Sequence, residues 1–256
     1  MKTLLLSLIL LTGQFVFAQK NKKDDVRFFP FDENWNACTM ENAKYFSAIE
    51  KLCDTAYELK TYNFAGPIIS IKTYKDAEAT TLHGRFVHYD TNGRIDSLGF
   101  ISNGRKDRWW YHYTDSFKIW QKEEYEDGKL LKKMGITEME EESKRRKELL
   151  DTTIKRIEIE ATFDGGEKKW RKYLEKKFEF PERAKKLKKS GNIILQFVID
   201  KEGYVAEPSI IQFVEYSIDE EGLRMMQNAP KWKPALQDGR YVKSYRRQPL
   251  TFVAPK

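Results

Sequence analysis

Three histidines, His83, His88 and His112, are the first residues to consider for acid–base or metal chemistry. His88 and His112 stand 24 residues apart at equivalent positions of a repeated pattern, which explains them without a shared metal. No carboxylate or cysteine recurs beside them at metal-ligand spacing. The chain also lacks the G-x-S-x-G elbow, the P-loop, the HExxH helix and a GxGxxG turn. We therefore predict no catalytic residue, no metal and no cofactor, and a protein that is not an enzyme.

Two cysteines, Cys38 and Cys53, form an even pair that could close a disulfide in an oxidising compartment. Between them, residues 40–59 carry apolar side chains at spacings of three and four, which predicts an amphipathic helix, although Tyr45 and Phe46 also fit a strand. A continuous helix would hold the two cysteines about 22 Å apart. A disulfide needs Cα atoms within about 7 Å. A bond and two free thiols therefore both stay open.

The first eighteen residues have the pattern of a secretory signal peptide. Lys2 gives a positive start, the run from Leu4 to Leu11 is almost wholly apolar, and Ala18 is a small residue at the expected cleavage site. An uncleaved anchor is the alternative, but the apolar stretch falls short of the about 20 residues that span a bilayer. We predict a periplasmic protein, with the inner face of the outer membrane as one location. No membrane span is expected in the mature chain.

Length and composition favour a folded protein of about two domains. The 256 residues are 40% hydrophobic and 14% aromatic, which is too apolar for a disordered chain. The mean hydropathy of -0.69 is too polar for a polytopic membrane protein.

Charge is unevenly distributed along the chain. Residues 19–155 hold 24 basic and 24 acidic side chains, whereas residues 156–256 hold 21 basic and 15 acidic ones. Within residues 168–189, eleven basic side chains accompany three acidic ones. This cluster predicts a solvated helix face, or a contact with an anionic envelope component or an acidic partner. Export argues against a nucleic-acid partner.

Residues 63–135 predict an antiparallel β-meander with a period of 24 residues. Residues 86–89 align with residues 110–113, and residues 103–105 align with residues 127–129. Each unit contains two strands and ends in Asn-Gly or Asp-Gly, dipeptides that suit tight hairpins.

The two units are similar to MORN-type repeats, which form β-meanders and serve as scaffolds more often than as catalysts. The second copy departs from the pattern because Phe117 stands where the first has Gly93. Before the meander, residues 19–62 predict a polar leader and a short helical or extended segment. After it, residues 136–160 predict a charged linker helix, since acidic residues precede basic ones and suit the helix dipole.

Residues 161–256 predict a small α+β domain with helices on one face of an antiparallel sheet. The expected elements are a helix through Trp170, Tyr173, Leu174 and Lys177, a break at Phe180-Pro181, a short helix at 182–189, strands at 192–200 and 204–214, a helix at 217–227 with Ser217 as its N-cap, and a strand at 242–253.

Several motifs in this region follow one another in a fixed order. They are Phe-x-Gly-Gly-Glu at 163–167, Phe-Pro-x-x-Ala at 180–184, Asp-x-x-Gly at 200–203, Pro-x-Trp-x-Pro-Ala at 230–235, Asp-Gly-Arg-x-Val at 238–242 and Gln-Pro-Leu-x-Phe at 248–252. In order and spacing, residues 161–253 resemble the TonB C-terminal domain in its Bacteroidota-type form.

The resemblance implies capture of an extended peptide, the TonB box of an outer-membrane receptor, as an added strand at an exposed sheet edge. We take the strand at 242–253 as that edge, because polar residues alternate along it. Pro249 has no donor and should limit pairing at that point. Phe180, Trp232 and Phe252 also suit core or corner positions. The predicted partner-binding residues are Phe180, Pro181, Arg183, Ser244, Tyr245, Arg246, Arg247, Gln248 and Leu250.

The chain departs from a full energy transducer. No proline occurs between Pro67 and Pro181, so a polyproline spacer is absent. The sequence favours a periplasmic partner-binding protein associated with TonB-dependent transport. The alternative is a structural or adaptor envelope protein that binds cell wall, another TonB-like protein or another partner through its repeats and basic segment. An anchored inner-membrane transducer is a third alternative, and an exposed edge strand leaves a homodimer open.

Overall fold

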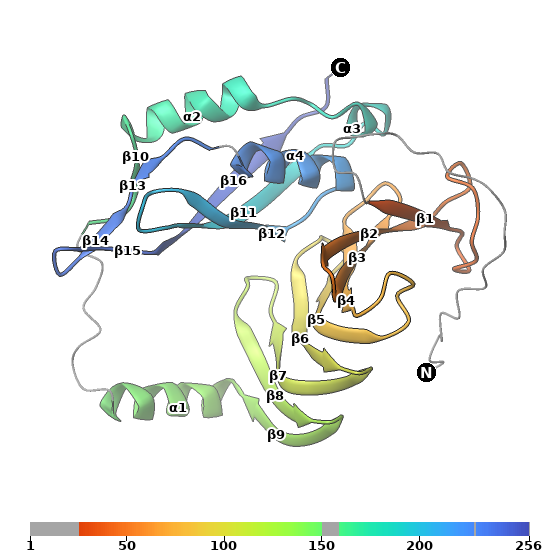
Figure 1. The fold of residues 1–256 in the computed structure, drawn as a ribbon, viewed down its shortest axis with the longest axis horizontal. Coiled ribbons are helices and arrows are strands. Elements are labelled where there is room, and N and C mark those ends of the chain that lie inside the picture. Colours follow the sequence, from red (N-terminus) through yellow and green to blue (C-terminus); the bar gives the residue numbers. More distant parts are fainter. Residues whose placement is uncertain (1–25, 150–158, 228, 256) are drawn as a thin grey trace. The chain divides into compact units, whose positions relative to one another are not determined.

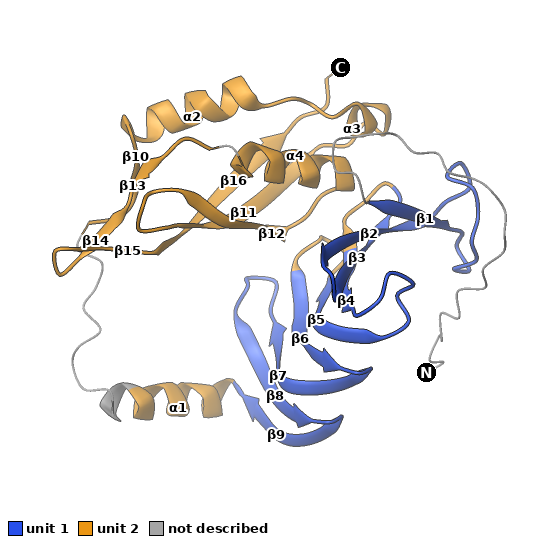
Figure 2. Cartoon of the chain, in the orientation of Figure 1, with its two compact units in different colours: residues 1–64, 69–89, 95–135 blue, residues 65–68, 90–94, 136–256 orange. Residues whose placement is uncertain are grey.

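The computed structural model describes residues 26–149, 159–227 and 229–255 (Figure 1). Two compact units make up the chain, and Figure 2 colours them separately. Unit 1 comprises Met1–Phe64, Ile69–Tyr89 and Ile95–Gly135, and unit 2 comprises Ala65–Ile68, Asp90–Arg94 and Ile136–Lys256.

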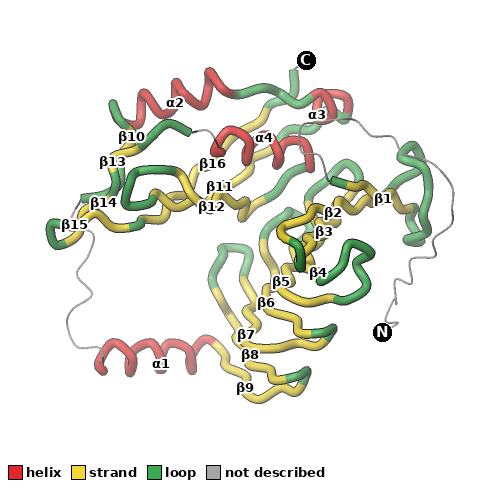
Figure 3. The backbone as a smooth tube through the Cα atoms, viewed as in Figure 1, coloured by secondary structure: helices red, strands yellow, loops and turns green. Residues whose placement is uncertain are grey.

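Unit 1 is built on a nine-stranded sheet whose strands follow one another in sequence order. Figure 3 shows these strands as a succession of hairpins joined by short turns. Arg27 belongs to the first strand, so the sheet also includes much of the 19–62 segment. The strands are β1 (Arg27–Phe31), β2 (Tyr45–Cys53), β3 (Ala56–Asn63), β4 (Ile68–Tyr74), β5 (Leu82–Tyr89), β6 (Ile95–Ser102), β7 (Arg105–Tyr113), β8 (Ile119–Glu126) and β9 (Lys129–Gly135).

The helix predicted for residues 40–59 is wrong, because this segment forms the hairpin of β2 and β3. Four successive residues of β2, from Phe46 to Ile49, are buried. A strand buried on both faces shows no alternation of polar and apolar residues, so its pattern can imitate one face of a helix. Ser47 is satisfied there by Thr61, with 2.9 Å between the two hydroxyl oxygens.

The predicted 24-residue period is confirmed by equivalent hydrogen bonds in successive hairpins. Asp90 N donates to Arg94 O at 2.8 Å, and one period later Thr114 N donates to Lys118 O at 2.8 Å. Strand β8 likewise begins and ends 24 residues after β6. The 24-residue repeat is therefore present in the structure as well as in the sequence.

Phe117 occupies the same turn position as Gly93 and adopts the same left-handed backbone. Its φ is 60°, compared with 72° at Gly93. Each of the two residues donates its N–H to the carbonyl three residues earlier, at 3.0 Å. A left-handed conformation costs a residue with a Cβ about 1–2 kcal/mol. The second copy thus carries local strain that the first copy avoids.

Close packing in unit 1 is clearest where Trp110 lies against Gly99. Trp110 is 4% exposed, and its Nε1 donates to Phe100 O at 3.1 Å. A Cβ added at Gly99 would lie 2.3 Å from the indole ring. The absence of a side chain at Gly99 is what allows this contact.

The first part of the linker helix predicted for residues 136–160 is present as α1 (Ile136–Leu149), whereas Ile159 forms a β-bridge with Leu236 and is not helical. Residues 150–158 lie outside the described part of the chain. From Ile136 to Arg146 only Met139 is half-buried, and the other side chains are exposed. Over this range α1 therefore lacks a buried apolar face.

The C-terminal region forms the predicted α+β domain. Its main sheet has three strands in the order β12-β11-β16, and β16 pairs antiparallel with β11. The elements are β10 (Thr162–Phe163), α2 (Gly166–Lys177), α3 (Glu182–Lys186), β11 (Gly191–Ile199), β12 (Val205–Gln212), α4 (Tyr216–Gln227), β13 (Trp232–Lys233), β14 (Ala235–Gln237), β15 (Arg240–Val242) and β16 (Ser244–Phe252).

Aromatic side chains form the core between α2 and the main sheet. Trp170 lies at the centre, with ring centroids 5.3 Å from Tyr173 and 5.0 Å from Trp232. Phe197 of β11 lies 6.0 Å from Trp232. Trp170, Tyr173 and Leu174 thus face the core, as their spacing predicts for a helix.

Ser217 as the N-cap of α4 is a wrong prediction. The helix begins at Tyr216, and the Glu215 carboxylate before it accepts hydrogen bonds from Ser217 N at 2.9 Å and Ser217 Oγ at 2.5 Å. A glutamate takes the cap position here because Arg183 compensates its charge, with 2.6 Å between Nε and Oε1.

Candidate partner-binding edge of the C-terminal domain

Strand β16 lies at an edge of the three-stranded sheet, as predicted for the segment 242–253. Among the described residues, β11 is its only paired strand. Figure 1 shows β16 running along the sheet with β11 beside it. The opposite edge is formed by β12. The domain therefore presents two strand edges to a partner, and the sequence motifs single out β16.

Proline at position 249 indicates which backbone groups face outward. Pro249 lies opposite Ile194 of β11 and has no N–H to donate. Proline is tolerated in an edge strand where the missing N–H would face away from the neighbouring strand. Because groups alternate along an antiparallel strand, Tyr245, Arg247 and Thr251 share this orientation with Pro249. Their N–H groups point to the open edge.

Side chains on one face of β16 are used within the domain. Arg246 donates from Nη2 to Ala161 O and lies 3.4 Å from Glu160 Oε2. Gln248 Oε1 accepts a 2.7 Å hydrogen bond from Trp170 Nε1. Ser244 on the same face is 2% exposed. These residues position β16 against the core, and Leu250, which is half-buried, lies on the same face.

The other face of β16 is exposed. Tyr245 is 73% exposed, and Arg247 donates from Nε to Gln196 Oε1 on β11 at 3.2 Å. Of the predicted residues on β16, Tyr245 and Arg247 are therefore the ones whose side chains an added strand could contact.

The Phe180-Pro181 segment is held in place by the domain core. The Phe180 ring lies 6.3 Å from Phe178 and 6.4 Å from the buried Phe252. Pro181 caps the short helix α3 in an extended conformation. Arg183, the second residue of α3, pairs with the fully buried Glu215.

The buried carboxyl group of Asp219, in the first turn of α4, was not predicted from the sequence. Asp219 is 1% exposed, its Oδ1 accepts from Val214 N at 3.0 Å, and its Oδ2 has no hydrogen-bond partner. Burial raises the pKa of Asp219 well above its usual range, and the neighbouring Glu215 charge adds to this. No spacing in the sequence distinguishes Asp219 from exposed helix residues.

The two cysteines are free thiols, so the disulfide alternative is not realised. Cys38 N bonds to Pro30 O, which places it near the start of β2, whereas Cys53 ends that strand. Nine residues of extended strand span about 30 Å. The extended conformation of β2 thus separates the thiols even more than a helix would.

The histidines lie in polar contacts of unit 1. His112 Nε2 is 3.3 Å from Glu123 Oε2, which also accepts from Tyr125 Oη at 2.9 Å. Burial favours the neutral acid, but the bonds from Tyr125 and His112 outweigh it and lower the pKa of Glu123. His88 Nδ1 is 3.3 Å from Asp96 Oδ2. Among the described residues, no group of three metal-ligating side chains lies close enough to hold an ion.

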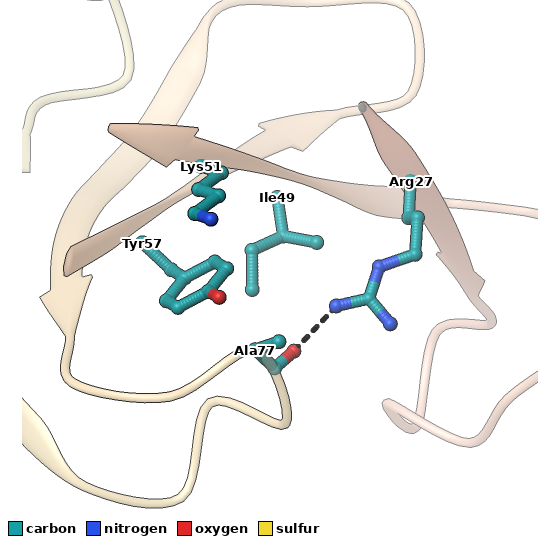
Figure 4. A pocket seen from close by; sticks show the side chains of 5 residues that line it. All are labelled: Arg27, Ile49, Lys51, Tyr57 and Ala77. Carbon is teal, nitrogen blue, oxygen red and sulfur yellow. Dashed lines mark hydrogen bonds between the residues drawn. The ribbon is translucent and has the colours of Figure 1, made fainter. Parts of the chain in front are cut away.

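Unit 1 also contains a pocket of about 300 Å³ near its first strands. Figure 4 shows Ile49 in its wall, with Arg27 on one side and Lys51 and Tyr57 on the other. Arg27 Nη2 donates to Ala77 O at 2.7 Å, which fixes the guanidinium at the rim.

Comparison with known proteins identifies the C-terminal region. Residues 176–254 match the family model of the Gram-negative bacterial TonB protein C-terminal. The match begins in the last turn of α2 and ends just after β16. The chain therefore contains a TonB C-terminal domain. Comparison with curated proteins and with solved structures found no match.

This domain links the protein to TonB-dependent transport and to the cell envelope. The family is a transport-associated one, and its domains are associated in general with outer-membrane receptors. Among the described helices, none is both long enough and apolar enough to cross a membrane.

Proposed function

We propose that the protein captures an extended peptide of an outer-membrane receptor as an added strand on β16. The observation that carries the proposal is the open edge of β16 within a TonB C-terminal domain. The outward N–H groups of Tyr245, Arg247 and Thr251 supply main-chain donors, and strand addition uses such groups for affinity. Pro249 interrupts the series, so one carbonyl of the incoming peptide stays unbonded to β16.

Selectivity in this proposal comes from the exposed face of β16. Tyr245 supplies aromatic area and Arg247 a charge, and each stands next to an outward backbone donor. Ser244, Arg246, Gln248 and Leu250 act indirectly by holding β16 straight against the core. Phe180, Pro181 and Arg183 have the same supporting role at the end of the domain where the strand finishes.

Site-specific photocrosslinking in cells tests this proposal. A photoreactive phenylalanine analogue at Tyr245 should give adducts to the periplasmic N-terminal segment of an outer-membrane receptor. The same analogue at Glu207, an exposed position on the opposite edge strand β12, is the matched control and should not. Adducts to the chain itself would indicate a homodimer through β16, and adducts only to cell-wall material would favour an adaptor; either result overturns receptor capture.

A proline substitution tests the backbone contribution separately. Thr251→Pro removes one outward donor without removing a bond to β11, whereas Thr251→Ala keeps that donor. The proline variant should lose the Tyr245 adduct while the alanine variant retains it. Equal adduct yields from both would exclude strand addition at this position.

A further inference from the structure

Helix α2 has one face in the core and an opposite face rich in lysine. Trp170 and Leu174 are buried, and Tyr173 is half-buried beside them. On a helix of 3.6 residues per turn, the lysines directed away from the core are Lys168, Lys169, Lys172 and Lys176, with Glu175 as the one acidic residue among them. All four are exposed. We call these four residues the α2 lysine face.

Glu175 offsets one of these four charges, and the other three are not compensated within the described structure. The ion pair on α2 joins Arg171 Nη2 to Glu167 Oε1 at 3.6 Å, and it involves none of the four lysines. Among the described residues, no carboxylate lies within ion-pair distance of the four lysines. Four like charges along about 12 Å of helix repel one another. A bound polyanion would relieve this repulsion.

The shape of the lysine face favours a flat partner. A helix face is convex, and α2 forms the upper margin of unit 2 in Figure 1. A peptide needs a groove or a strand edge, whereas a lipid surface needs only exposed charges that approach it together. Lysine carries a compact charge on a long flexible stem, which suits scattered phosphate headgroups better than it suits a fixed bidentate site.

An apolar side chain follows the lysines directly. Phe178 ends the helix and is 37% exposed, although one side of its ring lies 5.1 Å from Phe252. Aromatic rings at the end of a basic segment are typical of the boundary between water and headgroups.

We propose that the α2 lysine face binds the surface of a membrane that carries anionic phospholipid. The contact is electrostatic and peripheral, because the apolar face of α2 is already used in the core. It uses α2, whereas peptide capture uses β16, so the two functions are separate and one can fail without the other.

Vesicle sedimentation tests this inference with residues 19–256, which hold every described element and omit the apolar N-terminal run. The probe is a phosphatidylcholine vesicle with about 30% phosphatidylglycerol, compared with pure phosphatidylcholine. Binding should require the anionic lipid and weaken strongly when ionic strength rises from about 0.1 M to about 1 M. The triple variant Lys168→Glu, Lys172→Glu and Lys176→Glu should bind on the order of 100-fold more weakly, since each lysine near such a surface contributes about fivefold.

The matched control reverses three exposed charges on α1, with Lys144→Glu, Arg145→Glu and Arg146→Glu. It changes the net charge by the same amount and should bind within about twofold of the parent protein. An equal loss in both variants would mean that only net charge matters, and would overturn the inference. Equal binding to both kinds of vesicle would overturn it as well. Retention on heparin without vesicle binding would assign the face to another class of polyanion.

Discussion

Phe117 has a strained backbone conformation, so glycine should be favoured over alanine at this position. A φ of 60° is costly for any residue with a Cβ and free of that cost for glycine. We expect Phe117→Gly to be more stable than Phe117→Ala by about 1 kcal/mol, because the two variants lose the same ring and differ chiefly in strain. Chemical denaturation of unit 1 measures the difference. An alanine variant as stable as the glycine variant would show that the turn stores no such strain.

Asp219 should make the C-terminal domain less stable as the pH rises. Its pKa in the folded state is raised, so between its ordinary value of 3.8 and the raised value the folded state binds more protons than the unfolded state. Stability from this group is therefore present in acid and is lost as pH increases through the folded-state pKa.

Asp219→Asn tests this effect, because asparagine keeps the acceptor for Val214 N and cannot ionise. The variant should be the more stable protein at about pH 8, and the difference should shrink towards about pH 4. Hydrogen exchange of the β11 amides reports the stability of the domain at each pH. A difference that is independent of pH would contradict the assignment.

At the scale of elements, the Arg183–Glu215 pair ties α3 to the start of α4. Glu215 is completely buried, so removal of Arg183 leaves a charge without its counter-ion. We expect Arg183→Gln to destabilise the domain by about 3 kcal/mol. The bonds from Ser217 to Glu215 remain, so the variant should still fold.

A second substitution separates charge from packing in this pair. Adding Glu215→Gln to Arg183→Gln removes the buried charge and should restore part of the lost stability. Denaturant midpoints of the single and double variants give the comparison. A double variant less stable than Arg183→Gln would mean that the carboxylate stabilises the domain without Arg183.

Elements that end at glycine or proline could be predicted from the sequence. The hairpin turn at 200–203, the two strands that it joins and the break at Phe180-Pro181 follow from glycine, proline and alternating residues, and all are present. The β2 strand could not be predicted, because burial on both faces removes the period that marks a strand. Helix α2 could be predicted because only one of its faces is buried, so its apolar residues keep the helical spacing.

The candidate site was predictable in its backbone but not in its side chains. The edge position of β16 follows from the family motifs and from the alternating polar residues along the strand. The partners of Arg246 and Gln248 lie 85 and 78 residues away in the sequence, and no local pattern shows which face such residues occupy. The role of Glu215 as a helix cap could not be predicted either, because its partner Arg183 lies 32 residues earlier in the sequence.

At the scale of the whole molecule, we expect unfolding in two steps, because the chain has two compact units with separate buried side chains. Gly99→Ala forces the Trp110 ring to move and should lower the stability of unit 1 by about 1–3 kcal/mol. Arg183→Gln should affect unit 2. Calorimetry of the two variants should show that each shifts a different transition. A single transition that both variants shift would contradict the expectation that the two units unfold separately.

The repeated hairpins of unit 1 also bear on how the protein could change over generations. Within the described part of the chain, each strand from β5 to β9 pairs only with its neighbours in sequence, and the hydrogen bonds at Asp90 and Thr114 recur one period apart. Duplication of one 24-residue unit would therefore insert two strands without altering any other pairing. The sheet would grow by about 10 Å. Its length is thus open to adjustment by gene duplication, while the domain that follows keeps its own fold.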